Sequence, residues 1–233
     1  MRPAGRWPAR RLLAASGLTL GGLVVLGGLL HLPVARPLLA RLGAPCPVRT
    51  VSAAEVDAAR GPALAALRGE AAAPSRPALG LRLDATTAAD VRGWARQHGV
   101  SCIAPPRAAH TLACSDVPAV ALGLPASYGR VPDVALAFDA KGVLVAVDAL
   151  RRGLSPRDAA DAGAALVSRL SADLGPPSDR AGDWTAEHLD GPLRTSVVRF
   201  RFRDYVATVT ATHLPGSGVI LRQQYLSVGV PSV

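Results

Sequence analysis

The segment Thr195–Arg203, TSVVRFRFR, alternates arginine with phenylalanine from Arg199 onward. Successive side chains of a β-strand point to opposite faces of a sheet, so this period of two predicts a strand with one buried and one solvated face. Two more strand-like runs follow, Tyr205–His213 and Val219–Val228, and the turn sequence Pro215–Gly218 separates them. These runs predict an antiparallel meander near the end of the chain.

A second group of short strands is predicted in the middle of the chain. Its members are the β-like segments Val100–Ala104, His110–Asp116, Val134–Asp139 and Val143–Asp148. The last two are separated by Asp139–Gly142, in which glycine supplies the positive φ that a tight hairpin turn requires.

A predicted helix precedes each group of strands. Thr87 and Asp90 have the spacing of a capping box, in which a hydroxyl and a carboxylate satisfy free backbone amides at a helix start. Ser155, with Pro156 at the first helical position and Asp158 in the first turn, predicts a second and longer helix.

The N-terminal region contains a long apolar run. Leu12–Leu30, LLAASGLTLGGLVVLGGLL, carries no charge, and four arginines precede it. As a helix with a rise of 1.5 Å per residue, this run would be roughly 28 Å long, close to the hydrocarbon thickness of a bilayer. The run therefore predicts a transmembrane anchor over residues 12–34, with the short N-terminal tail in the cytoplasm. A cleaved signal peptide is the alternative.

Charge is distributed unevenly along the 233 residues, whose formal net charge is +9. Residues 1–49 hold seven arginines and no acidic residue, so the remaining chain carries only about two net positive charges. A nucleic-acid-binding domain needs a basic face on its folded part. The composition therefore argues against a nucleic-acid partner.

These patterns predict an α+β fold, with an N-terminal transmembrane helix followed by helices packed on antiparallel β-sheet in two helix-plus-meander halves. The predicted halves span residues 84–149 and 155–228. The predicted organisation along the chain is a cytoplasmic tail at 1–11, an anchor at 12–34, a linker at 35–51, a helical segment and linker at 52–80, and an extracytoplasmic α+β domain at 81–229.

Cys102 and Cys114 lie in two neighbouring strand-like segments, and outside the cytoplasm they are expected to form a disulfide. A metal site is the alternative, because His98 precedes Cys102 by the same spacing as His110 precedes Cys114. Zinc fingers use tighter pairs, so the disulfide is favoured and no metal is expected. Cys46 remains unassigned in either case.

No catalytic residue is predicted. Gly216–Gly218 lacks the pattern of a nucleophile elbow, and His188 and His213 are isolated among polar residues. Neither a P-loop nor a dinucleotide-binding motif is present, so no cofactor is expected. The sequence favours a protein that is not an enzyme.

The segment Leu83–Val91, LDATTAADV, opens a short helix before antiparallel strands. It resembles the start of modules in the BamE/SmpA family, which are small outer-membrane assembly lipoproteins similar in fold to β-lactamase inhibitor proteins. The second half, with Leu170, Leu174 and Gly175 before a run that ends in Tyr205, is similar to the same pattern. The resemblance implies an interaction module without enzymatic activity, although the chain has no lipobox.

Taken together, the sequence predicts a membrane-anchored binding or scaffolding module of the cell envelope. It would cross the bacterial inner membrane once and hold an envelope protein with its extracytoplasmic domain. Two alternatives remain open at this point. One is an anchored metal-binding protein or enzyme that uses His98, Cys102, His110 and Cys114, and the other is a secreted or periplasmic soluble protein with a cleaved signal peptide.

Overall fold

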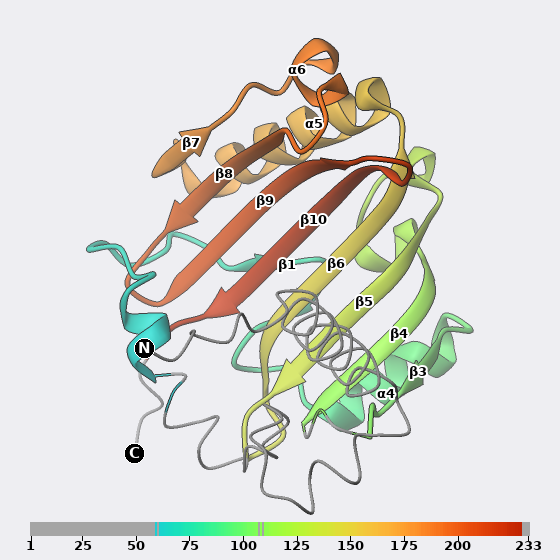
Figure 1. The fold of residues 1–233 in the computed structure, drawn as a ribbon. Helices are drawn as coiled ribbons and strands as arrows, with labels where there is room; N and C mark the ends of the chain where they lie inside the picture. Colours follow the sequence, from blue (N-terminus) through green and yellow to red (C-terminus); the bar gives the residue numbers. More distant parts are fainter. Residues whose placement is uncertain (1–58, 60, 107, 109, 230–233) are drawn as a thin grey trace, which may run out of the picture. The chain divides into compact units, whose positions relative to one another are not determined.

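One antiparallel sheet of eight strands dominates the computed structural model, which describes residues 59, 61–106, 108 and 110–229 (Figure 1). The order of strands across the sheet is β3-β4-β5-β6-β10-β9-β8-β7. The strands are β3 (Ser101–Ile103), β4 (Thr111–Pro118), β5 (Arg130–Phe138), β6 (Leu144–Leu154), β7 (Asp179–Ala181), β8 (Thr195–Arg201), β9 (Tyr205–Leu214) and β10 (Gly218–Ser227).

Two meanders share this sheet. Strands β3 to β6 are neighbours in chain order, and so are β7 to β10. The two series meet where β10 pairs with β6, in a register that places Gln223 opposite Ala149 and Tyr225 opposite Val147. Backbone hydrogen bonds therefore run without interruption from one edge of the sheet to the other.

This architecture corrects the predicted fold class, which is wrong. The prediction placed a transmembrane helix before helices packed on sheet in two halves, whereas the described residues form mainly one large sheet with few helices. The strands predicted for residues 84–149 and 155–228 belong to a single hydrogen-bonded layer. Local sequence patterns indicate most of these strands, but the β6–β10 pairing depends on contacts between distant residues.

The predicted membrane anchor at residues 12–34 lies outside the described residues, as do the predicted tail at 1–11 and linker at 35–51. Within the part of the chain that the structure describes, no helix is both long enough and apolar enough to cross a bilayer. Residues 61–65 are helical, despite the Gly61-Pro62 pair at which a break is expected.

The helices are α4 (Ala88–Gln97), α5 (Pro156–Leu174) and α6 (Ala186–Asp190). Both predicted helix starts are confirmed. The Thr87 hydroxyl accepts a hydrogen bond from the Asp90 amide, and the Asp90 carboxylate accepts one from the Thr87 amide. At α5, the Ser155 hydroxyl accepts from the Asp158 amide at 3.1 Å.

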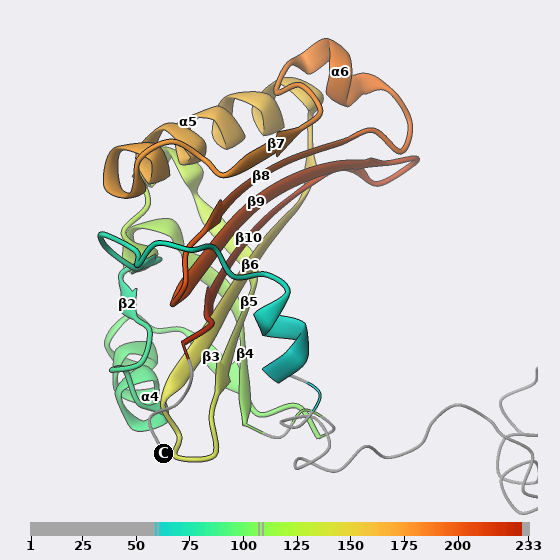
Figure 2. The ribbon, with the colours of Figure 1, turned by 90° about the vertical axis from the view of Figure 1, so that its left-hand side faces the viewer.

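The sheet is curved, and α4 and α5 cover its convex face (Figure 2). The core lies between these helices and the sheet. Its largest fully buried side chains include Phe200, Tyr205 and Leu136 from the sheet, while Leu166 and Leu170 of α5 are nearly as buried. Alternate side chains of each strand therefore point into this core, as the period of two in the sequence predicts.

Six short elements fall in segments where no regular structure is expected. Residues 69–80 have the composition of a linker, but a small hairpin, β1 (Pro77–Ala78) and β2 (Leu81–Arg82), begins within them. The polar loop at 178–193 contains β7 and α6. The connection between β4 and β5 forms two 3-10 helices, η2 (Ala119–Leu122) and η3 (Ala126–Tyr128).

Candidate binding surface

The concave face of the sheet, opposite α4 and α5, is called the open face here. On β8, Ser196, Val198 and Phe200 point into the core, whereas Thr195, Val197, Arg199 and Arg201 alternate with them and are at least partly exposed. The strand registers extend this division across the sheet. The central side chains of the open face are Ala113, Asp133, Ala135, Ala137, Ala146, Asp148, Leu150, Val197, Arg199, Arg201, Val206, Thr208, Thr210, Arg222, Gln224 and Leu226.

Small side chains cover much of the open face. Thr208, Thr210 and Thr212 follow one another at every second position of β9, and the Thr212 hydroxyl lies 3.2 Å from that of Thr195 on β8. On β4, β5 and β6, several open-face positions are alanine, namely Ala113, Ala135, Ala137 and Ala146. Because the sheet is curved, this face is concave (Figure 2), and its concave surface is called the trough.

An ion pair crosses the centre of the sheet at the β6–β10 boundary. The Arg222 Nε donates to Asp148 Oδ1 at 2.9 Å, and its Nη2 also donates to this carboxylate. Gln224 Nε2 donates to Asp148 Oδ2 at 3.3 Å. The hydrogen bond to Asp148 raises the pKa of the Arg222 guanidinium. This network fixes two long polar side chains at the floor of the trough.

A hollow of about 400 Å³ lies beside this ion pair. Its lining comes from four strands and combines small, apolar and charged groups, namely Ala113, Cys114, Ser115, Asp133, Val134, Ala135, Asp148, Leu150 and Arg222. The volume is within the range of ligand-binding pockets, and a carboxylate and a guanidinium both reach it. The hollow can therefore accept one inserted side chain together with its hydrogen-bonding groups.

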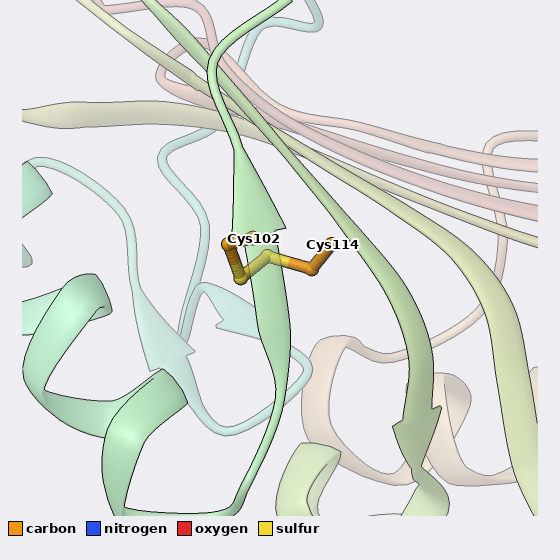
Figure 3. The surroundings of a disulfide bond; sticks show 2 residues. All are labelled: Cys102 and Cys114. Atoms are coloured by element: carbon orange, nitrogen blue, oxygen red, sulfur yellow. A yellow bond between two sulfur atoms is a disulfide. The ribbon is translucent and has the colours of Figure 1, made fainter.

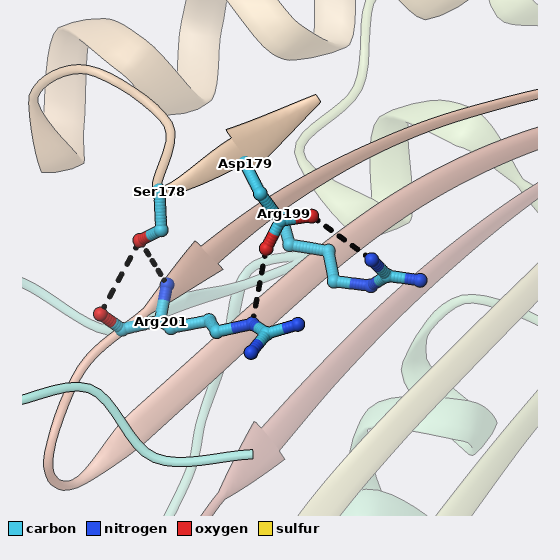
Figure 4. A network of polar contacts seen from close by, with 4 residues as sticks. All are labelled: Ser178, Asp179, Arg199 and Arg201. Carbon is cyan, nitrogen blue, oxygen red and sulfur yellow. Dashed lines mark hydrogen bonds and ion pairs between the residues drawn. The ribbon is translucent and has the colours of Figure 1, made fainter. Parts of the chain in front are cut away.

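A second ionic network lies toward the β7 edge (Figure 4). Asp179 accepts from Arg199 Nη1 at 2.9 Å, and its other oxygen lies 3.1 Å from Arg201 Nε. The Ser178 hydroxyl accepts from the Arg201 amide at 2.8 Å. Of the three arginines that alternate with phenylalanine in the sequence, only Arg199 and Arg201 lie on the open face. Strand β8 ends at Arg201, and Arg203 lies in the turn that follows.

The sulfur atoms of Cys102 and Cys114 lie at disulfide distance (Figure 3). The two residues are directly opposite each other on β3 and β4. The pair predicted from the sequence therefore links an edge strand to its neighbour, and Cys114 is 2% exposed.

The alternative metal site is not assembled. Cys102 and Cys114 are bonded to each other, while His98 lies at the end of α4, where its ring packs against Trp94 with centroids 5.7 Å apart. His110 is exposed and has a positive φ of 60°. Among residues 59, 61–106, 108 and 110–229, no three His, Cys, Asp or Glu side chains gather in an arrangement that could hold a metal ion.

The residues weighed for hydrolytic chemistry are also dispersed. Ser217 lies in the β9–β10 turn, where its amide donates to the Leu214 carbonyl. His213 Nδ1 lies 3.1 Å from the Asp190 carbonyl oxygen, and His188 belongs to α6. Sequence reasoning missed Asp148 and Asp179, because cross-strand pairing and not local spacing brings each of them to its arginine.

Comparison with known proteins gives no family for this chain. No protein-family model matches it, and neither the curated proteins nor the solved structures include a significant match. The open face, with its trough, hollow and two ionic networks, is accordingly interpreted from its own chemistry. It offers a broad surface with fixed polar groups, which suits recognition of a large partner.

Proposed function

We propose that this chain is a binding or scaffolding module of the cell envelope, which holds a protein partner on its open face and catalyses no reaction. The observation that carries the proposal is the contrast between the two faces of one sheet. One face is covered by α4 and α5, whereas the other presents a concave surface of small side chains.

The chemistry of the open face supports a protein partner. Interfaces between proteins have a well-packed centre, often with arginine, and the polar groups there are hydrogen-bonded. Arg222, held by Asp148, and Arg199, held by Asp179, are arginines of this kind because their guanidinium groups are already oriented. The hollow beside Ala135 and Leu150 provides a place for an apolar anchor side chain of the partner.

The location in the envelope rests on the sequence. The apolar run at residues 12–34 predicts single-pass attachment to the bacterial inner membrane, and the bond-distance cysteine pair suits an oxidising compartment. The similarity of Leu83–Val91 to the opening of BamE/SmpA modules points to the same kind of protein.

Site-specific photocrosslinking in the native host tests the proposal. A benzoylphenylalanine would be placed in the full-length chain at Ala135 or at Thr210, both on the open face. Ser168, exposed on α5, is the control position. We expect a protein adduct of one defined mass from both open-face positions and none from Ser168. The proposal would be wrong if Ser168 gave the same adduct, or if neither open-face position gave one.

A further inference from the structure

A second hollow, of about 440 Å³, lies on the convex side of the sheet, between the β1–β2 hairpin and α5. Tyr225 of β10 contributes to it from the sheet, and Leu166 and Leu170 line it from α5. Leu79 and Leu81 of the hairpin form the opposite wall. These side chains make an apolar interior of the size that small-molecule sites have.

The hairpin that closes this hollow is strained. Its two turn residues, Leu79 and Gly80, have φ values of 55° and 76°. A two-residue turn with positive φ at both positions favours Asn-Gly or Asp-Gly, because a branched side chain in the left-handed region clashes with the backbone. Leu79 nevertheless adopts it, with its side chain only 7% exposed. Strained residues held by their surroundings concentrate at ligand clamps and similar sites.

Positive charge predominates among the residues that line this hollow. Arg76, Arg82 and Arg169 contribute three guanidinium groups, and Asp173 contributes one carboxylate. Arg76 is paired with Asp84 at 2.6 Å. Arg169 Nη1 donates to the Gly123 carbonyl oxygen at 2.6 Å, which leaves its other nitrogen atoms able to donate. Within the described part of the chain, neither Arg82 nor Arg169 has a carboxylate at ion-pair distance.

We propose that this hollow binds a fatty acid. The carboxylate would lie against the guanidinium groups of Arg82 and Arg169, and the acyl chain would enter between the hairpin and α5, toward Tyr225. An anionic head group fits because guanidinium groups bind carboxylates through charge-assisted hydrogen bonds. A single apolar chain fits because five leucine side chains and Tyr225 contribute to the lining between the hairpin and α5. This site uses the face opposite the proposed partner surface, so either proposal can fail alone.

Photolabelling with a dodecanoic acid that carries a diazirine on its acyl chain tests the proposal. Full-length protein in lipid nanodiscs would be irradiated with the probe, and the labelled residues would be located by mass spectrometry. We expect labels on residues 77–82 and 166–170, and we expect excess dodecanoate to remove them. Labels confined to other parts of the chain would overturn the proposal. Equal competition by dodecanol would overturn the role given to the carboxylate.

Charge-neutralising variants sharpen this test. Arg169→Gln and Arg82→Gln each remove one guanidinium group, and each is expected to weaken the competition by dodecanoate about tenfold, the effect of losing a hydrogen bond to a charged group. Arg157→Gln removes the same charge from an exposed position near the start of α5 and is expected to leave binding unchanged. Two arginines are tested because Arg169 also contacts the η2–η3 loop. Unchanged competition in both variants, or equal weakening by Arg157→Gln, would overturn the proposal.

Discussion

The two faces of the central sheet use the same strands for different purposes. On β8, Phe200 is fully buried beneath the helices, whereas its neighbours Arg199 and Arg201 keep about a third of their side-chain surface exposed. The convex face consists mainly of close-packed aliphatic and aromatic side chains, and the open face of threonine, alanine and paired ions. Alternate residues of one strand can therefore serve stability and recognition separately, and substitutions on the two faces should have different effects.

The largest effect is expected from truncating a core residue. Phe200→Ala should lower the free energy of unfolding by about 3–5 kcal/mol, because it removes a fully buried aromatic ring and leaves a cavity. Arg199→Ala, one residue away on the open face, should lower it by no more than about 1 kcal/mol. Urea denaturation of both variants measures the difference. Equal losses would contradict the assignment of the two faces.

The disulfide-distance pair tests the edge of the sheet. Replacing Cys102 and Cys114 together by serine should lower the free energy of unfolding by about 3 kcal/mol, since a link between residues 12 positions apart restricts the unfolded chain. Denaturation of the double variant, compared with the oxidised parent, gives the value. The reduced parent is the control, because it also lacks the link and should lose the same free energy of unfolding as the double variant. If the double variant and the oxidised parent were equally stable, the link would contribute nothing.

One glycine in each of the helices α4 and α5, which cover the convex face, provides a matched pair for testing how closely the helices are packed. At Gly163 of α5 a Cβ atom would overlap the Trp184 ring, so Gly163→Ala should destabilise by about 1–3 kcal/mol through overpacking. At Gly93 of α4 the nearest atom, Arg96 Nη2, is 3.9 Å away. Gly93→Ala should therefore stabilise by about 0.5–1 kcal/mol, the gain in helix propensity. Thermal unfolding distinguishes the two, and the same sign for both variants would contradict this packing.

The open-face ion pair should matter more for binding than for folding. Asp148→Asn should change the free energy of unfolding by no more than about 1 kcal/mol, because the partner Arg222 side chain is 45% exposed and screened by solvent. The same variant should reduce the photocrosslinked adduct from Ala135, since Arg222 loses its fixed orientation. Asp116→Asn, which removes a charge outside the hollow and outside these open-face positions and whose partner Arg130 is 52% exposed, is the control and should leave the adduct unchanged. A normal adduct from Asp148→Asn would remove this pair from the binding surface.

The smallest effect concerns the start of α4. Hydrogen bonds from the Thr87 amide and hydroxyl lower the pKa of Asp90 below its ordinary value of 3.8. A carboxyl group with a lowered pKa stabilises the folded state above its unfolded pKa, and this stabilisation is lost as the pH falls through its folded pKa. The contribution of Asp90 should therefore be constant near neutrality, begin to fall near pH 3.8 and be lost once the pH is below the lowered pKa. An NMR titration of the Asp90 carboxyl carbon measures the pKa of this group, and a midpoint above 3.8 would contradict the capping geometry.

Local signals in the sequence account for α4, α5 and most strands. The capping residues Thr87 and Ser155 mark the starts of α4 and α5, because a cap depends only on residues within one turn. The C-terminal strands follow from their period of two. Strand β6 extends to Leu154, beyond the predicted Asp148, because its pairing with β10 continues there.

Long-range contacts explain what the sequence could not predict. The β1–β2 hairpin has strands of two residues each, too short for any periodicity, and the Tyr205 hydroxyl donates to the Pro77 carbonyl from far along the chain. The open face could not be predicted, because alternation shows that a strand has two faces without showing which one the helices cover. For α6, the cap residue Thr185 is a local signal that could have been used.

Accessibility of the open face in its native membrane shows whether a partner covers this face. Single cysteines would be introduced by Ala135→Cys on the open face and Ser168→Cys on α5, each in full-length protein that also carries Cys46→Ser. The rate of maleimide labelling would be compared between native membranes and purified protein. If a partner covers the open face, the Ala135→Cys variant should be labelled more slowly in membranes than after purification, whereas the Ser168→Cys variant should be labelled at the same rate in both. Equal rates at Ala135→Cys would contradict a partner on the open face.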